Sequence, residues 1–191
     1  MSRQRRRSAH THNSPSGGLG LRPLGGGEFE LEHPRCVMDR ELDYAEGIEL
    51  WKAGDPEAAR DALRFALDGC GDNLWVHVAL GRIALESYRD PALARGHLGY
   101  AVQMVQRVLP CGFRGRLPGE QPANQPFFDA LEGLAACHDA LQQTAEAARL
   151  RSWSERLKGR RKSTGTSSAG DRKDRLPDRG ESPSELPEGE P

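Results

Sequence analysis

The chain contains an internal repeat, and this feature constrains its fold more than any other. The pair Asp55-Pro56 recurs 35 positions later as Asp90-Pro91. Aspartate followed by proline is typical of a helix start, because the carboxylate caps free backbone N–H groups and proline fits the first helical position. The residues that follow match as well: Ala59-Arg60 with Ala94-Arg95, Leu63 with Leu98, Phe65 with Tyr100, Ala66 with Ala101, and Leu67 with Val102. The repeat therefore predicts two helices in equivalent surroundings.

Small residues also recur at a regular spacing, one in each helix of a pair and twelve or thirteen positions apart. The pairs are Gly47 with Ala59, Gly81 with Ala94, and Ala135 with Ala147. Small side chains at both positions allow two helices to cross closely. The sequence thus predicts three helix-turn-helix units, of which the third is separated from the others by residues 110–126.

Apolar periodicity and the breakers between apolar stretches predict six helices. We expect Asp39 to cap the first helix, which ends at Gly54. The others are expected at about 56–68, 74–87, 91–109, 127–141 and 144–157. Gly96 and Gly99 lie inside the fourth, where each costs up to about 1 kcal/mol relative to alanine, so another helix is expected to approach them closely.

Over residues 39–157 the chain resembles the tetratricopeptide repeat (TPR) family, whose unit is a helix-turn-helix of 34 residues. The resemblance implies an all-α fold, a short right-handed superhelical array of about three repeats. The third unit departs from the pattern, with Arg151 and Ser154 where the first has Leu63 and Ala66, and a polar last helix fits a terminal cap. An ordinary helical bundle is the alternative.

Residues 110–126 are rich in proline and glycine and cannot form a continuous helix. They loosely resemble a connector of some bacterial repeat proteins, which implies an ordered loop laid along the helices. A plain surface insertion is the alternative interpretation. Phe113 and Leu117 favour some packing of this segment.

The chain is expected to comprise a basic arm at 1–36, a helical domain at 37–158 and a charged tail at 159–191. Both ends lack the apolar content that offsets chain entropy, so we expect them to be disordered. The arm has several arginines but no apolar run after them, which argues against a secretory signal. With no stretch long enough to span a membrane, a cytoplasmic protein is expected.

The four cysteines lie far apart, and in a reducing compartment disulfides are not expected. His33-x-x-Cys36 and the adjacent Cys137-His138 match no common zinc spacing, so we predict no metal site. The phosphate-binding glycine loop and the Gly-x-Ser-x-Gly elbow are missing from the sequence. We therefore predict neither an enzyme nor a cofactor.

We expect instead a protein-interaction or scaffold module, because the first helices of stacked pairs line a concave surface. The resemblance places eight residues there: Tyr44, Ile48, Trp51, Lys52, Val78, Arg82, Leu85 and Glu86. Trp51 stands out, since tryptophan is enriched in binding hot spots. Its alternative role is packing against the neighbouring helix pair.

The expected partner is another protein, bound as a peptide or a helix. The alternative is a nucleic acid, bound through phosphate contacts by the arginines of residues 3–7 and the basic residues at 158–162. No aromatic residues are interleaved with these cations, so a stacking platform for single strands is lacking. Three repeats are near the minimum for independent stability, which also makes a homo-oligomer an option.

Overall fold

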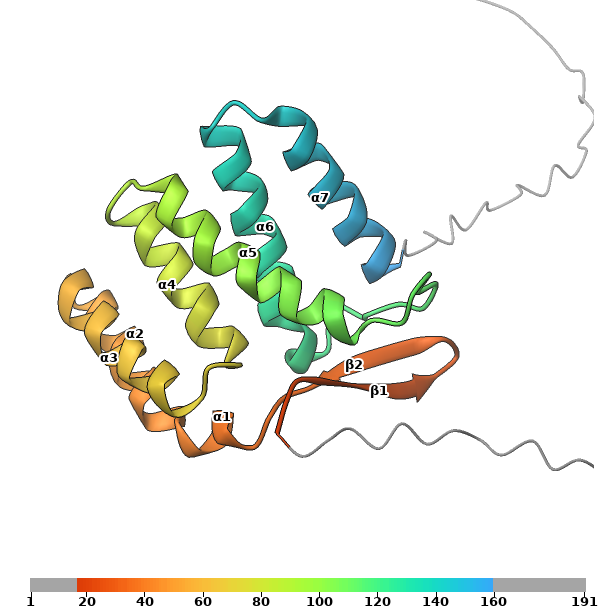
Figure 1. Cartoon of the computed structure of the whole chain (residues 1–191), viewed down its shortest axis with the longest axis horizontal. Coiled ribbons are helices and arrows are strands. Elements are labelled where there is room, and N and C mark those ends of the chain that lie inside the picture. The colour runs from red at the N-terminus through yellow and green to blue at the C-terminus, as the bar shows by residue number, and fades with distance from the viewer. Residues whose placement is uncertain (1–16, 160–191) are drawn as a thin grey trace, which may run out of the picture. The chain divides into compact units, whose positions relative to one another are not determined.

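The computed structural model describes residues 17–159 (Figure 1). These residues form seven α-helices, one 3-10 turn and one two-stranded sheet. The elements are β1 (Gly20–Gly25), β2 (Glu28–Glu32), α1 (Cys36–Asp39), α2 (Glu41–Lys52), α3 (Pro56–Gly69), α4 (Leu74–Glu86), α5 (Pro91–Val108), η1 (Pro122–Asn124), α6 (Gln125–Ala140) and α7 (Thr144–Lys158). The expected disorder of residues 1–16 and 160–191 concerns parts of the chain outside the described residues.

The two aspartates of the repeat begin their helices as predicted. The Asp55 carboxylate accepts a hydrogen bond of 2.9 Å from the backbone N–H of Ala58. Asp90 accepts from the backbone N–H groups of the second and third residues of α5. The prediction that Asp39 caps the first long helix is wrong, because Asp39 is the last residue of the short α1 and Arg40 precedes α2.

Consecutive helices pack in pairs, α2 with α3, α4 with α5, and α6 with α7. The first two pairs have an equivalent contact between their two helices. A Cβ placed on Gly47 would lie 2.6 Å from Leu63 Cγ, and one on Gly81 would lie 2.5 Å from Leu98 Cγ. Both leucines are fully buried. Glycine is thus required where a leucine of the second helix fills the space against the first.

The explanation offered for Gly96 and Gly99 is wrong. A Cβ at either position would meet no atom within 4 Å, so no other helix approaches them in the described structure. Both glycines line a hollow of α5, across which lie His138 of α6 and Leu150 of α7. The structure gives no account of why glycine occupies these positions.

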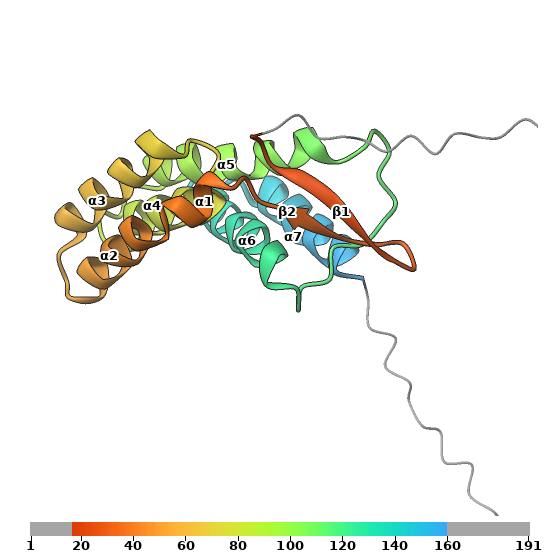
Figure 2. The same ribbon diagram turned by 90° about the horizontal axis from the view of Figure 1, so that it is seen from below.

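The expectation of an unstructured arm through residue 36 is wrong for residues 20–32, which form an antiparallel hairpin. The consecutive glycines at 25–27 all have positive φ and make the turn that joins the strands. Leu31 of β2 is only 2% exposed and joins the core that contains Phe127 and Leu157. The fold is therefore mostly helical with a small sheet, and Figure 2 shows the hairpin near α7, with α2 and α3 at the other end.

The segment 110–126 is ordered and packed, as the connector interpretation implied. Leu117 and Asn124 have no exposed surface. Arg116 continues the hairpin as a parallel bridge, since its carbonyl accepts from Phe29 N–H at 2.8 Å. The next residue, Leu117, donates its N–H to the Leu157 carbonyl, also at 2.8 Å. The connector thus joins β2 to the last turn of α7.

Asn124 fixes the hairpin to the start of α6. Its side-chain oxygen accepts from the Leu31 N–H at 2.9 Å, and its amide donates to the carbonyls of Phe29 and Pro118 at 3.1 Å each. Every polar atom of this buried side chain therefore has a partner, as burial demands. The neighbouring His33 makes a similar link through Nε2, which lies 2.7 Å from the Ala123 carbonyl.

The expectation of no disulfide is wrong for one pair of cysteines. Cys36 of α1 and Cys70, which follows α3, are disulfide-bonded, with Cα atoms 5.5 Å apart. Spacing along the chain hides this contact, because α2 and α3 form an antiparallel pair whose two ends meet. The bond closes the chain around the first helix pair.

Candidate functional site

The first helices of the three pairs provide a common surface. α4 packs against both α2 and α6, although the three helices are far apart in sequence. A side chain on α2 can therefore lie near side chains of both other helices. The residues predicted to bind a partner come from α2 and α4 only.

Trp51 lies against α4 and is half-buried. Its indole N–H donates a hydrogen bond of 3.0 Å to Ser87 Oγ, just after α4. The Arg82 guanidinium lies 5.2 Å from the centre of the indole ring, within the range of a cation–π contact. These contacts agree with the alternative role of Trp51, which is packing against the neighbouring helix pair.

Arg82 is held by two neighbours and still reaches solvent. Its Nε donates to Glu86 Oε1 at 2.9 Å, one turn further along α4. The side chain remains 51% exposed and that of Glu86 49% exposed. The guanidinium is therefore oriented by Trp51 and Glu86 while keeping donors free for a ligand.

Charged groups from α2, α4 and α6 act on the hydroxyl of Tyr44. Burial raises the pKa of its hydroxyl, the negative charge of Asp129 on α6 raises it further, and the positive charges of Arg82 and Lys52 lower it. Each of these effects requires the charged group to lie near the Tyr44 hydroxyl. Arg82 on α4 and Asp129 on α6 therefore both lie near Tyr44 on α2.

Asp129 was not predicted from the sequence. Its carboxylate accepts a 2.7 Å hydrogen bond from Gln125 Nε2, one turn earlier on α6. The insertion 110–126 displaces the third unit, so the repeat register gave candidate positions for the first two units only. An acidic residue in the first turns of the displaced helix was the available signal.

The other predicted residues divide by exposure. Ile48 and Leu85 are half-buried, and Lys52 is exposed and pairs with Glu49 at 2.8 Å. Val78 is only 6% exposed and belongs to the hydrophobic core. The protein itself therefore covers Val78, and it has little surface left for a partner.

An apolar hollow of about 290 Å³ continues this surface at the start of α2. Its lining includes Val37, Tyr44 and Trp75. Met38, which also lines it, is 78% exposed, and nearby Leu42 is 84% exposed. Exposed apolar side chains next to a hollow are typical of a surface that contacts another molecule. The sequence did not point to Val37 or Met38, because they precede the expected helix.

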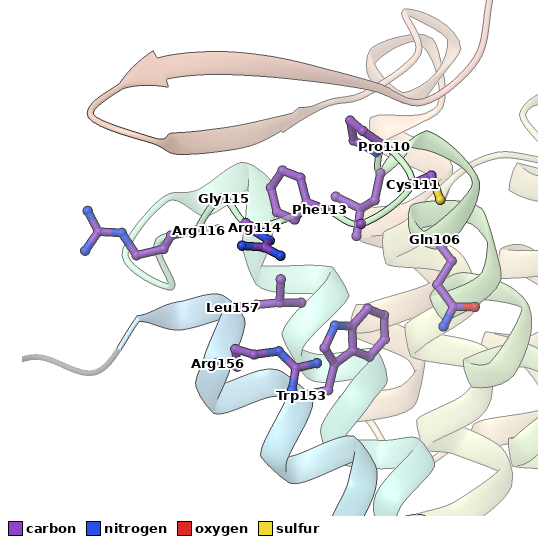
Figure 3. A pocket seen from close by; sticks show the side chains of 12 residues that line it. Gln106, Pro110, Cys111, Phe113, Arg114, Gly115, Arg116, Trp153, Arg156 and Leu157 are labelled. Atoms are coloured by element: carbon purple, nitrogen blue, oxygen red, sulfur yellow. The ribbon is translucent and has the colours of Figure 1, made fainter.

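A second hollow, of about 620 Å³, lies between residues 109–116 and the last turns of α7 (Figure 3). Trp153, Arg114 and Arg156 are among its lining side chains. Within residues 17–159, neither of these arginines has a carboxylate within 4.0 Å, whereas Arg116 pairs with Glu28 at 3.0 Å. The hollow combines an aromatic ring with cations, but nothing in it joins it to the surface around Tyr44.

Most residues of the basic arms lie outside the described part of the chain, so their predicted phosphate contacts stay a prediction. Lys158 is described, and its ammonium lies 4.9 Å from the centre of the Phe128 ring. None of the helices within residues 17–159 is both long and apolar enough to cross a membrane. Comparisons with models of protein families, with curated proteins and with solved structures gave no match to this chain.

Proposed function

We propose that this chain is a non-catalytic interaction module, in which three TPR-like helix pairs form a short superhelical array that binds a partner peptide or helix. The equivalent crossings at Gly47 and Gly81 and the equivalent caps at Asp55 and Asp90 support the repeat. In such arrays the first helices of the pairs line the binding surface. Here these are α2, α4 and α6.

The observation that carries the proposal is that Arg82 and Asp129, from the two other first helices, both lie near Tyr44. An aromatic ring, a cation and an anion from three separate helices offer apolar contact and two charges of opposite sign. The half-buried Trp51 fixes the position of Arg82, and the hollow beside Tyr44 extends the apolar part. An amphipathic helix or an extended peptide with charged side chains suits this arrangement.

The test uses charge reversals that leave the core intact. Arg82→Glu breaks the exposed pair with Glu86 and the cation–π contact with Trp51, each of which contributes about 1 kcal/mol of stability or less at an exposed site. Asp129→Arg reverses the facing charge on α6. Arg149→Glu is the matched control, because Arg149 lies on α7 with its side chain 80% exposed. Unchanged helicity and melting temperature would show that the variants still fold.

Affinity purification from the native cells, read by mass spectrometry, should recover a partner with the unchanged chain and with Arg149→Glu. Recovery should fall at least tenfold with Arg82→Glu and with Asp129→Arg. A partner that all four proteins recover equally would show that binding occurs elsewhere on the chain. Loss restricted to Arg149→Glu would contradict the assignment of the surface to α2, α4 and α6.

A further inference from the structure

Two histidines that the interaction surface does not use face each other between α4 and α5. His77 Nδ1 and His97 Nδ1 are 3.4 Å apart, and the ring centres are 5.7 Å apart. His77 is 8% exposed and His97 is half-buried. Two helices of the same pair therefore hold two ring nitrogens at a fixed separation.

The tautomer of His77 follows from its other nitrogen. Nε2 lies 3.0 Å from the carbonyl oxygen of Gly71, which can only accept. Nε2 therefore carries the proton and donates it, and Nδ1 of the neutral ring has a lone pair directed away from Gly71. Metal-binding histidines are commonly oriented in this way, with the second ring nitrogen donating to a carbonyl.

The distance between the two Nδ1 atoms distinguishes a direct hydrogen bond from joint coordination of one metal ion. An N–H donor normally lies about 2.7–3.2 Å from its acceptor, so 3.4 Å is long for a direct hydrogen bond. Two imidazole nitrogens bound to one tetrahedral Zn²⁺, each about 2.0–2.1 Å from the ion, are about 3.4 Å apart. The observed separation fits the second arrangement.

We propose that His77 and His97 bind one divalent transition-metal ion through their Nδ1 atoms. Imidazole suits Zn²⁺ and Cu²⁺, and Cu²⁺ is expected to bind more tightly. Within residues 17–159 no group of three or more His, Cys, Asp or Glu side chains could hold a metal. The ion therefore has two ligands from this part of the chain, and water or a partner molecule completes its coordination.

The surroundings of the pair favour neutral rings. Burial lowers the pKa of both His77 and His97, so both imidazoles are unprotonated at neutral pH. Two charged groups act on the pair in opposite directions: Asp72 raises the pKa of His77 and Arg64 lowers that of His97. A cation at the site is therefore attracted by Asp72 and repelled by Arg64.

The experiment is a calorimetric titration of the untagged full chain with ZnCl₂ and with CuSO₄ in a buffer that does not chelate metals. His10 and His12 in the N-terminal arm are also ligands, so both are replaced with glutamine in every protein tested. Exposed Cys111 is replaced with serine for the same reason. One equivalent of either ion should then bind.

In this background His97→Gln should weaken binding at least tenfold, and so should His77→Gln. His138→Gln is the matched control and should change nothing, because His138 hydrogen-bonds Gln143 on another helix pair. Arg64→Gln should strengthen binding by removing a repelling charge. The ring nitrogens give an independent readout, since Zn²⁺ should shift the Nδ1 resonances of both rings in nitrogen-15 NMR.

Equal binding by the parent and by His97→Gln would overturn the proposal, as would no binding of either ion at millimolar concentration. A shift of the Nε2 resonances in place of Nδ1 would contradict the stated geometry. Failure of the metal-site proposal would not contradict the proposed interaction surface, because neither histidine belongs to that surface.

Discussion

Replacing Gly81 or Gly96 with alanine makes the same chemical change on two helices, and the structure predicts opposite effects on stability. Gly81 lies inside α4 and faces Leu98, whose Cγ would be 2.5 Å from the new Cβ. Gly96 lies inside α5 and is exposed, with no atom within 4 Å of a new Cβ. The pair therefore separates helix propensity from packing.

The magnitudes follow from these two environments. Alanine is favoured over glycine in a helix interior by about 1 kcal/mol, so Gly96→Ala should stabilise the protein by about 0.5–1 kcal/mol. Gly81→Ala gains the same propensity but overpacks the core, which typically costs about 1–3 kcal/mol. The Cγ of Leu98 is a branch point near the backbone and cannot swing aside as a side-chain tip can. The free energies of unfolding of the two variants should therefore differ by about 1–3 kcal/mol.

Urea unfolding followed by far-ultraviolet circular dichroism measures this difference, provided that the slope of free energy against urea is unchanged. Leu98→Ala supplies the control, since Gly81→Ala made in that background should lose its penalty and behave like Gly96→Ala. If Gly81→Ala stabilises the native sequence as much as Gly96→Ala does, the close crossing of α4 and α5 is wrong.

Three further predictions concern the N-terminal segment. Burial lowers the pKa of His33, so as the pH falls the unfolded chain takes up a proton at this residue before the folded chain does. The free energy of unfolding should therefore fall as the pH drops below about 6.5. Urea unfolding at pH 7.5 and 5.5 should show a smaller fall for His33→Gln than for the native chain. Asn124→Ala should cost about 2–4 kcal/mol in the same assay, because Leu31 N–H loses its buried acceptor and two carbonyls lose their donor; a cost no larger than that of an exposed substitution would contradict the link. Reduction of the Cys36–Cys70 bond, which spans 34 positions, should cost about 3–4 kcal/mol, whereas the double alanine variant should melt at one temperature with or without reductant.

The sequence predicted most helices because their limits depend on local chemistry. Asp55 and Asp90 each cap the helix that they precede, and proline at the next position agrees with that start. α5 was expected to end at residue 109 and ends at Val108. These signals act within one helical turn, so no knowledge of distant contacts is needed to read them.

The hairpin and the disulfide were missed because both depend on distant contacts. After the glycines at 25–27, Phe29 and Leu31 alternate with three glutamates, but the stretch before these glycines has leucines at 21 and 24 and does not alternate. One alternating stretch favours a single strand but supplies no matching partner strand, and proline and glycine were taken as signs of disorder. The strands are held by residues far along the chain: Arg116 and Asn124 of the connector bond to β2, and Leu31 shares a core with Phe127 and Leu157.

The candidate surface was predicted in part. The repeat register identified Tyr44 and Arg82, which the structure places near each other. The same register included Val78, which lies in the core because α4 is covered on more than one side. Asp129 depended on the position of the third helix pair, and the intervening connector concealed it. The opposed His77 and His97 depend on the rotation of α4 against α5, and spacing alone does not fix that angle.

The connector also affects the order in which the parts of this protein are expected to unfold. In a linear array of helix pairs the terminal pair has a single neighbour, so unfolding begins at an end and spreads inward. Here the last turn of α7 is hydrogen-bonded to Leu117, and the preceding Arg116 is bonded to Phe29 of the N-terminal hairpin. Detachment of α7 would therefore break a bond to the same segment that holds the hairpin, so we expect the two to open together. The hairpin and α7 should consequently exchange their amide hydrogens at one common rate, in a single all-or-none opening.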